Sequence, residues 1–168
     1  MAASRRYPGP GRHPLGELRL GALLTVVPDR ARCTGCGITH VVLDAGLLPR
    51  RAYAADLAGQ ALVAAAWGRG HRLIARDLAV PQGTVRGWIR RACRSAGQLR
   101  AAGLQAVVAL DPDALPAQVR PSQLAYALDA LGAAAIALGD RFGVQHVSPW
   151  ARVTVLTRGQ LLNLSPDG

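Results

Sequence analysis

Short apolar runs separated by turn residues fill the first part of the chain. These runs are Leu18–Leu20, Leu23–Val27 and Ile38–Leu43, and glycine, proline and the turn Cys33–Gly37 lie between them. Apolar runs bounded in this way predict strands. We therefore expect a small β-ribbon over residues 15–50. A flexible arm is expected over residues 1–14, where proline and glycine are frequent.

Beyond residue 51 the apolar positions follow helical spacing. Residues 54–67 carry leucine and alanine three and four apart, and two glycines follow them. A second helix is expected from His71 to about Ala79. Pro81 then begins a third helix, which continues to about Ala96, because proline suits the start of a helix. The pattern predicts a three-helix unit over residues 51–97.

Residues 98–168 also show helical spacing, with breaks at Asp111–Pro116 and Val147–Pro149. Ser148 followed by Pro149 is typical of a helix start, and Gly159 is expected to end that helix. A narrow apolar seam follows the expected helix 124–142 and consists of Leu124, Leu128, Leu131, Ala135, Leu138 and Phe142. These side chains cannot all face water. The seam therefore packs either within the chain or in a homodimer.

Charge divides the chain into two parts. All 20 basic residues are arginine, and the formal net charge is +10. Residues 1–100 hold 16 arginines and five acids, whereas residues 101–168 hold four arginines and five acids. A basic part joined to a nearly neutral part is typical of a polyanion-binding region attached to a packing or assembly region. Nucleic acid is the obvious polyanion, although a G- and C-rich coding sequence accounts for part of the arginine excess.

The segment 72–91 combines two short helices with a tight turn. Its expected inward side chains are Ile74, Leu78 and Val80 around the first helix, and Val85, Trp88 and Ile89 on the second. Ala75 is small at the point where two crossing helices approach each other. This spacing is typical of a helix-turn-helix. One departure is Ala79, at a turn position where many examples carry glycine.

Polar side chains occupy the outward face of the third helix. Arginine and glutamine are well suited to bidentate contacts with guanine and adenine edges. Residues 69–94 hold seven arginines and one acid, so phosphate contacts are also expected. We assign base reading to Gln82, Thr84 and Arg86, either a base or a phosphate to Arg90, and phosphate contacts to Arg72, Arg76 and Arg91. The alternative is an ordinary helical hairpin with a solvated arginine face.

The three cysteines form one pair and one single residue. Cys33 and Cys36 lie in a Cys-x-x-Cys-Gly turn that directs two thiolates at one point, as in a zinc knuckle. Zinc is the one candidate cofactor, but the site is incomplete, because a structural zinc ion needs four ligands and a second cysteine pair is missing. His40 and His13 are candidate third and fourth ligands, and a packed or solvated His40 is the alternative. Cys93 is expected to be a small buried residue.

Three segments resemble a known family. Arg-Cys-x-x-Cys-x-x-Thr-His-Val-x-Leu at 32–43, Gly-x-Gly-His-Arg-x-Ile-Ala at 68–75 and Val-Pro-x-x-Thr-Val-Arg-Gly-Trp-Ile-Arg-Arg at 80–91 resemble an uncharacterised bacterial family of zinc-ribbon plus helix-turn-helix proteins. These proteins look like the DNA-binding ends of insertion-sequence transposases. The resemblance covers residues 30–168. In the family an earlier Cys-x-x-Cys completes the ribbon, so here either the start lies further upstream or the ribbon has decayed.

Several classes of protein are not expected. A transposase of the three-acid type needs a large α/β domain after its DNA-binding end, whereas Glu17, the only glutamate, precedes the helix-turn-helix. The run Leu20–Val27 is too short for a membrane span and lacks the flanks of a signal peptide. No small-molecule substrate is indicated. We expect a cytoplasmic, nucleoid-associated protein without enzymatic activity.

The expected fold is mainly α, with a helix-turn-helix at 51–97, a small N-terminal β-ribbon and a C-terminal helical packing part at 98–168. The expected function is sequence-specific binding of double-stranded DNA by a transposase-related or mobile-element protein. A stand-alone transcriptional regulator is the close alternative. A protein-assembly module that uses the same helices belongs to a different class and stays open.

Overall fold

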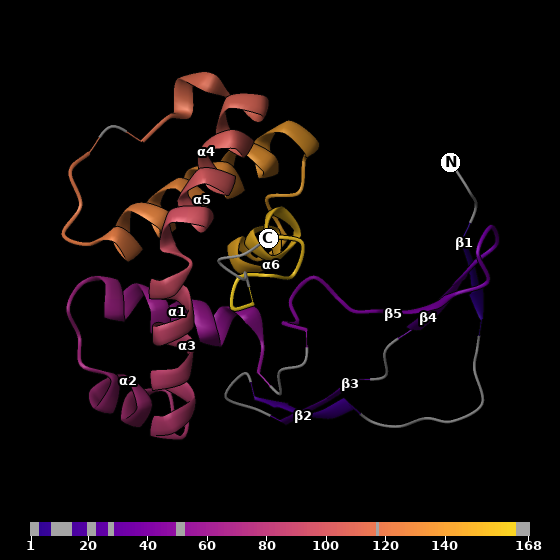
Figure 1. Cartoon of the computed structure of the whole chain (residues 1–168), viewed down its shortest axis with the longest axis horizontal. Coiled ribbons are helices and arrows are strands. Elements are labelled where there is room, and N and C mark those ends of the chain that lie inside the picture. The colour runs from indigo at the N-terminus through magenta and orange to yellow at the C-terminus, as the bar shows by residue number, and fades with distance from the viewer. Residues whose placement is uncertain are drawn as a thin grey trace.

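The computed structural model describes residues 4–7, 15–19, 23–26, 29–49, 53–116 and 118–163. It is mainly helical, and small antiparallel sheets lie in its N-terminal part. Figure 1 shows α1, α2 and most of α3 grouped together, with the paired helices α4 and α5 above them and the strands to one side. None of the described helices is long and apolar enough to cross a membrane.

The strands form two antiparallel sheets. One sheet has the order β1-β4-β5, and β2 pairs with β3 in the other. The bounds are Ser4–Tyr7 for β1, Leu15–Arg19 for β2, Leu23–Val26 for β3, Asp29–Cys33 for β4 and Thr39–Val42 for β5. In the register of the first sheet, Ser4 lies opposite Cys33 and Arg32 lies opposite Thr39. The expected strands near 18–27 and 38–43 are therefore present.

Two strands differ from the sequence-based expectation. β1 lies in the segment expected to be a flexible arm, and β4 lies where only turns were expected. The reason is that neither strand has an alternating apolar pattern, and β4 consists mainly of arginine and other polar residues. Both strands exist because their backbone groups pair with a neighbouring strand. Residues 8–14 of the expected arm lie outside the described residues.

The helices begin and end close to the predicted positions. Their bounds are Ala55–Ala66 for α1, His71–Asp77 for α2, Gln82–Arg94 for α3, Ala96–Leu110 for α4, Gln123–Phe142 for α5 and Pro149–Leu156 for α6, with a short 3-10 helix at Pro112–Ala114. The predicted cap of α6 is confirmed, because the Ser148 hydroxyl accepts hydrogen bonds from the amides of Trp150 and Ala151. Ser122 caps α5 in the same way through the amide of Ala125.

These two cap residues also bind α1. The Ser122 hydroxyl donates to the carbonyl oxygen of Ala66 at 3.2 Å, and the Ser148 hydroxyl donates to Oδ1 of Asp56 at 2.6 Å. Ala66 is the last residue of α1, and Asp56 lies in its first turn. Hydrogen bonds from the starts of α5 and α6 therefore hold the two ends of α1.

A single hydrophobic cluster spans the helical part. Its members come from α1, α2 and α3, and also from α4, α5, α6 and the segment after α6. In α3, Trp88 is fully buried, and its ring meets that of Tyr53 edge to face with 5.2 Å between centroids. Backbone contact is also close between α4 and α5, where a Cβ on Gly103 would lie 2.7 Å from the carbonyl carbon of Ala130. The boundary expected near residue 97 therefore does not divide the core.

Most of the predicted seam of α5 packs inside this cluster. Leu124, Leu131 and Ala135 are buried in the core, and Leu128 packs against it. Of the two alternatives for the seam, the structure shows packing within the chain. Phe142, the last residue of the seam, is 64 % exposed, because α5 ends there.

Candidate nucleic-acid interface

The connection between α2 and α3 is a tight turn of four residues. The amide of Val80 donates to the carbonyl of Ala75 at 3.0 Å, and the amide of Ala79 donates to the carbonyl of Arg76 at 3.3 Å. Ala79 has φ +51°, so it adopts the left-handed conformation. Glycine adopts this conformation without steric cost, which explains why the position favours glycine. Val80 is buried next to it and fixes the turn to the core.

The inward side chains of this segment are those that the sequence pattern indicates. Ile74, Val80, Val85 and Trp88 are each at most 5 % exposed, and Leu78 and Ile89 pack against the same cluster. Ala75 is buried, as expected for a close crossing of helices. The burial of these residues determines which side of α3 faces outward.

The outward side of α3 carries a polar stripe. We use "α3 stripe" for Gln82, Arg86 and Arg90, which follow one another at steps of four residues and are all exposed. Side chains at this spacing lie on one helical face, opposite the buried set. Within the described part of the chain, no ion pair engages Arg86 or Arg90. Their guanidinium groups are therefore available for an anionic partner.

The other predicted site residues lie in different surroundings. Thr84 is half-buried in the first turn of α3. Arg91 is also half-buried and lies along the helix, with Nη1 only 3.1 Å from the place that a Cβ on Gly87 would occupy. Arg72 is exposed on α2. The structure brings the α3 stripe together, whereas Thr84 and Arg91 lie at its margins.

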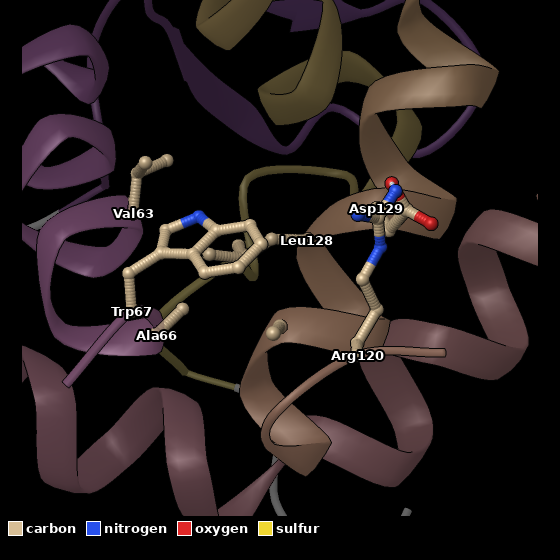
Figure 2. A pocket seen from close by; sticks show the side chains of 7 residues that line it. Val63, Ala66, Trp67, Arg120, Leu128 and Asp129 are labelled. Atoms are coloured by element: carbon tan, nitrogen blue, oxygen red, sulfur yellow. Dashed lines mark hydrogen bonds and ion pairs between the residues drawn. The ribbon is translucent and has the colours of Figure 1, made fainter. Parts of the chain in front are cut away.

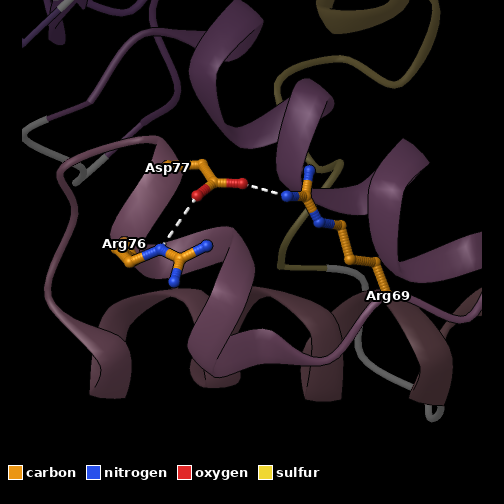
Figure 3. A network of polar contacts seen from close by, with 3 residues as sticks. All are labelled: Arg69, Arg76 and Asp77. Carbon is orange, nitrogen blue, oxygen red and sulfur yellow. Dashed lines mark hydrogen bonds and ion pairs between the residues drawn. The ribbon is translucent and has the colours of Figure 1, made fainter.

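Arg76 is exposed but not free. Figure 3 shows Asp77 between two arginines: Arg76 Nε lies 3.2 Å from one carboxylate oxygen, and Arg69 contacts the other. Asp77 is the only acidic residue in 69–94. The prediction from the sequence that Arg76 contacts phosphate did not include its ion pair with Asp77. Because Asp77 compensates part of the positive charge, it lowers the attraction of this corner for an anion.

Sequence reasoning also missed a contact between the starts of α2 and α3. Nε2 of His71 lies 3.2 Å from Nε2 of Gln82. Each is the first residue of its helix, and the turn at 78–81 brings these two ends together. The sequence pattern predicts both short helices and the turn between them, so the proximity of these two helix starts could have been predicted from it.

The cysteine pair lies at the tip of the β4–β5 hairpin. The amide of Cys33 donates to the carbonyl of Ile38 at 2.9 Å, the amide of Gly37 donates to the carbonyl of Cys33 at 3.0 Å, and Gly37 has φ +72°. Hydrogen bonds from the backbone and thiol of Cys36, and from the backbone of Gly35, lower the pKa of Cys33. Amides directed at one sulfur stabilise a thiolate, the form that binds metal.

The remaining zinc ligands are not found among the described residues. No group of three or more histidine, cysteine, aspartate or glutamate side chains gathers there in a way that holds a metal ion. His40 pairs across the hairpin with Ala31 and does not join the two cysteines in such a group. His13 lies outside the described part. The cysteine turn therefore fits half of a zinc site.

Cys93 differs from its expected environment. It is exposed, although a buried position was predicted. The buried face of α3 runs through Val85, Trp88 and Ala92. Cys93 follows Ala92 and is rotated by about 100° around the helix, which turns it away from the core.

A separate hollow lies between the end of α1 and the start of α5. Figure 2 shows Trp67 and Val63 on one side, Leu128 opposite, and Arg120 beside Asp129 at the edge. Arg120 Nη2 lies 2.6 Å from Oδ1 of Asp129, so the two charges compensate each other. No histidine, cysteine or hydroxyl side chain is present among the described residues that line it.

No family model matches this chain, and neither a curated protein nor a solved structure matches it.

Proposed function

We propose that α1, α2 and α3 form a helix-turn-helix and that the α3 stripe binds double-stranded DNA in a sequence-specific manner. The observation that carries the proposal is the stripe itself: Gln82, Arg86 and Arg90 are exposed on one face of a helix. The opposite face of that helix is anchored in the core by Val85 and Trp88. A rigidly held helix with outward arginine and glutamine side chains suits the major groove.

The individual roles follow from position along the helix. The first turns of a recognition helix usually meet base edges, so Gln82 and Arg86 read bases. Arg90 lies one turn further on and reaches a base or a phosphate. Arg72, on α2, contacts phosphate. Arg76 contributes less to phosphate binding than an unpaired arginine, because Asp77 compensates part of its charge.

The resemblance of segments 32–43, 68–75 and 80–91 to transposase-related proteins favours a mobile-element role for this DNA binding. A transcriptional regulator uses the same interface. The two roles are distinguished by genomic context, such as terminal inverted repeats or an adjacent catalytic gene. The assembly-module alternative predicts no salt-dependent affinity for DNA.

The test is a binding measurement on the full chain. A preferred duplex is selected from a random library, and its affinity and that of a random duplex are measured as a function of salt concentration. Arg86→Ala is expected to cost about 1–3 kcal/mol on the preferred duplex and to relax the preference at one base pair. Arg141→Ala is the matched control, because Arg141 is exposed near the end of α5. Equal losses on both duplexes for Arg86→Ala would show that Arg86 reads no base.

We also propose that Cys33 and Cys36 provide two of the ligands of a zinc ion. The observation in favour is the tight turn at the tip of the β4–β5 hairpin, which carries both cysteines and whose hydrogen bonds also lower the pKa of Cys33. One thiolate alone cannot hold a structural ion, so Cys33→Ser and Cys36→Ser are each expected to abolish zinc content. Metal analysis of the full chain, purified without added zinc, measures this. Less than about a tenth of an equivalent in the wild-type protein contradicts the proposal.

A further inference from the structure

The contact between His71 and Gln82 joins the proposed reading helix to the helix before it. The two Nε2 atoms are 3.2 Å apart. Gln82 is exposed at the start of the α3 stripe, whereas His71 is half-buried at the start of α2. An exposed glutamine normally samples many rotamers and both orientations of its amide. Here one partner constrains the side chain.

The chemistry of the two nitrogens decides which one donates. An amide nitrogen carries two hydrogens and accepts no hydrogen bond, so Gln82 is the donor. Nε2 of His71 is then the acceptor, which requires a neutral imidazole with its hydrogen on Nδ1. In the arrangement that the structure has, Gln82 donates and His71 accepts, so the contact ties the orientation of the Gln82 amide to one tautomer of His71.

The fixed amide leaves a defined pair of groups for a partner. One hydrogen of Nε2 is used by His71, and the other hydrogen and Oε1 stay available. Adenine presents an acceptor at N7 and a donor at N6 in the major groove, which matches this pair, whereas guanine presents two acceptors. An amide turned the other way would place Oε1 at the imidazole and only donors outward, which suits guanine.

We propose that His71 is a positioning residue that holds Gln82 in the orientation that reads adenine. This inference rests on the proposed binding of DNA by the α3 stripe and adds the identity of one base. His71 acts through Gln82 and needs no contact with DNA itself. Its substitution therefore weakens the preference for adenine at that position and leaves the affinity for random duplexes unchanged.

The experiment compares base preferences of full-chain variants on a library of duplexes randomised across the site. The wild-type protein is expected to prefer adenine over guanine at one position by at least about fivefold. Gln82→Ala abolishes this preference. His71→Ala reduces it to less than about twofold. His146→Ala is the matched control, since His146 is exposed between α5 and α6.

The outcomes separate this inference from the proposed function. An adenine preference that survives His71→Ala overturns the inference, and so does a loss that is equal at every position of the site. A wild-type preference that depends on Arg86 but not on Gln82 overturns the inference and leaves the proposed function standing. Absence of any preference in the wild-type protein overturns both. Added to Gln82→Ala, the His71→Ala substitution is expected to have no further effect, and an additional loss contradicts the positioning role.

Discussion

The indole ring of Trp150 lies directly against the backbone of Gly59. A Cβ at residue 59 would lie 2.0 Å from Cε2 and 2.1 Å from Cδ2 of this ring, far inside contact distance. Trp150 belongs to α6 and Gly59 to α1. The C-terminal helix therefore reaches the first helix of the proposed DNA-binding unit at a point where only glycine fits.

Gly59→Ala is expected to destabilise the protein by about 1–3 kcal/mol or more, because the added methyl group overpacks the contact with Trp150. The higher helix propensity of alanine, about 1 kcal/mol, offsets only part of this cost. Urea unfolding measures the difference. Gly132→Ala is the matched control. Among the described residues, no atom outside the local backbone of its own helix lies within 4 Å of its Cβ position, and the variant is expected to gain stability. If both variants shift alike, the contact between α1 and α6 is not the cause.

Ala79→Gly is expected to stabilise the protein by about 0.5–1 kcal/mol. The left-handed conformation costs a non-glycine residue about 1–2 kcal/mol, and glycine removes this cost. The greater conformational freedom of glycine in the unfolded chain lowers the stability and offsets part of the improvement. Ala79 has φ +51°. Ala101→Gly, at an exposed position inside α4, is the control and is expected to lose about 1 kcal/mol. Thermal unfolding of both variants measures the change in stability. A lower stability of Ala79→Gly than of the wild-type protein would contradict the prediction.

Asp77→Asn is expected to strengthen DNA binding without regard to sequence. The substitution removes the charge that Arg69 and Arg76 contact, so both guanidinium groups become available to phosphates. The dependence of log affinity on log salt concentration should steepen by about one to two units. Asp140→Asn removes the same charge from an exposed position near the end of α5 and is the control. Equal effects of the two substitutions would indicate a general charge effect.

Leu131→Asp is expected to destabilise the fold by about 2–5 kcal/mol, because it places a charge in a packed site. Leu131 is 1 % exposed, whereas Ile136 on the same helix is 62 % exposed. Ile136→Asp therefore serves as the control, and its melting temperature should stay close to that of the wild-type protein. Solution mass is measured alongside. Unchanged melting of Leu131→Asp with a halved mass would place the seam in a dimer interface instead.

Cys33 is expected to react with iodoacetamide at a lower pH than Cys93 in protein freed of metal by a chelator. Hydrogen bonds from Cys36 and Gly35 lower the pKa of Cys33, whereas partial desolvation raises the pKa of Cys93. The thiolate is the reacting form, so on raising the pH its population grows first at Cys33. Peptide mass mapping across a pH series measures the order. Earlier modification of Cys93 would contradict it.

The helical part of the fold was predictable because local signals agree there. Ser148 with Pro149, the glycines after α1 and the apolar spacing of α3 each reflect interactions within a few residues along the chain. The strands β1 and β4 were not predictable in this way. Their stability comes from backbone pairing with neighbouring strands, which requires no alternating apolar pattern and leaves none in polar segments such as Asp29–Cys33.

The outward residues of α3 were predictable from the inward ones, since the burial of Val85 and Trp88 determines the direction of Arg86 and Arg90. The polar partners of the site were not. Arg69 and Asp77 are eight residues apart, and His71 and Gln82 are eleven apart. The first contact depends on how the segment before α2 is placed beside the end of that helix, and the second depends on how the turn at 78–81 places α3 beside α2. Cys93 was wrongly predicted to be buried because cysteine is one of the most frequently buried residue types. Its side chain is exposed because position 93 lies about 100° around α3 from the buried Ala92.

The continuous core also constrains how this chain can change in evolution. A helix-turn-helix that folds by itself can be exchanged between proteins by recombination as a ready-made unit. Here α1 is held at its two ends by Ser122 and Ser148, and Trp150 covers its middle at Gly59. A recombination event at residue 97 would separate these partners and leave apolar surface uncovered on both products. Residues on the two sides of that point are therefore expected to be inherited together, with substitutions in α6 matched by substitutions in α1.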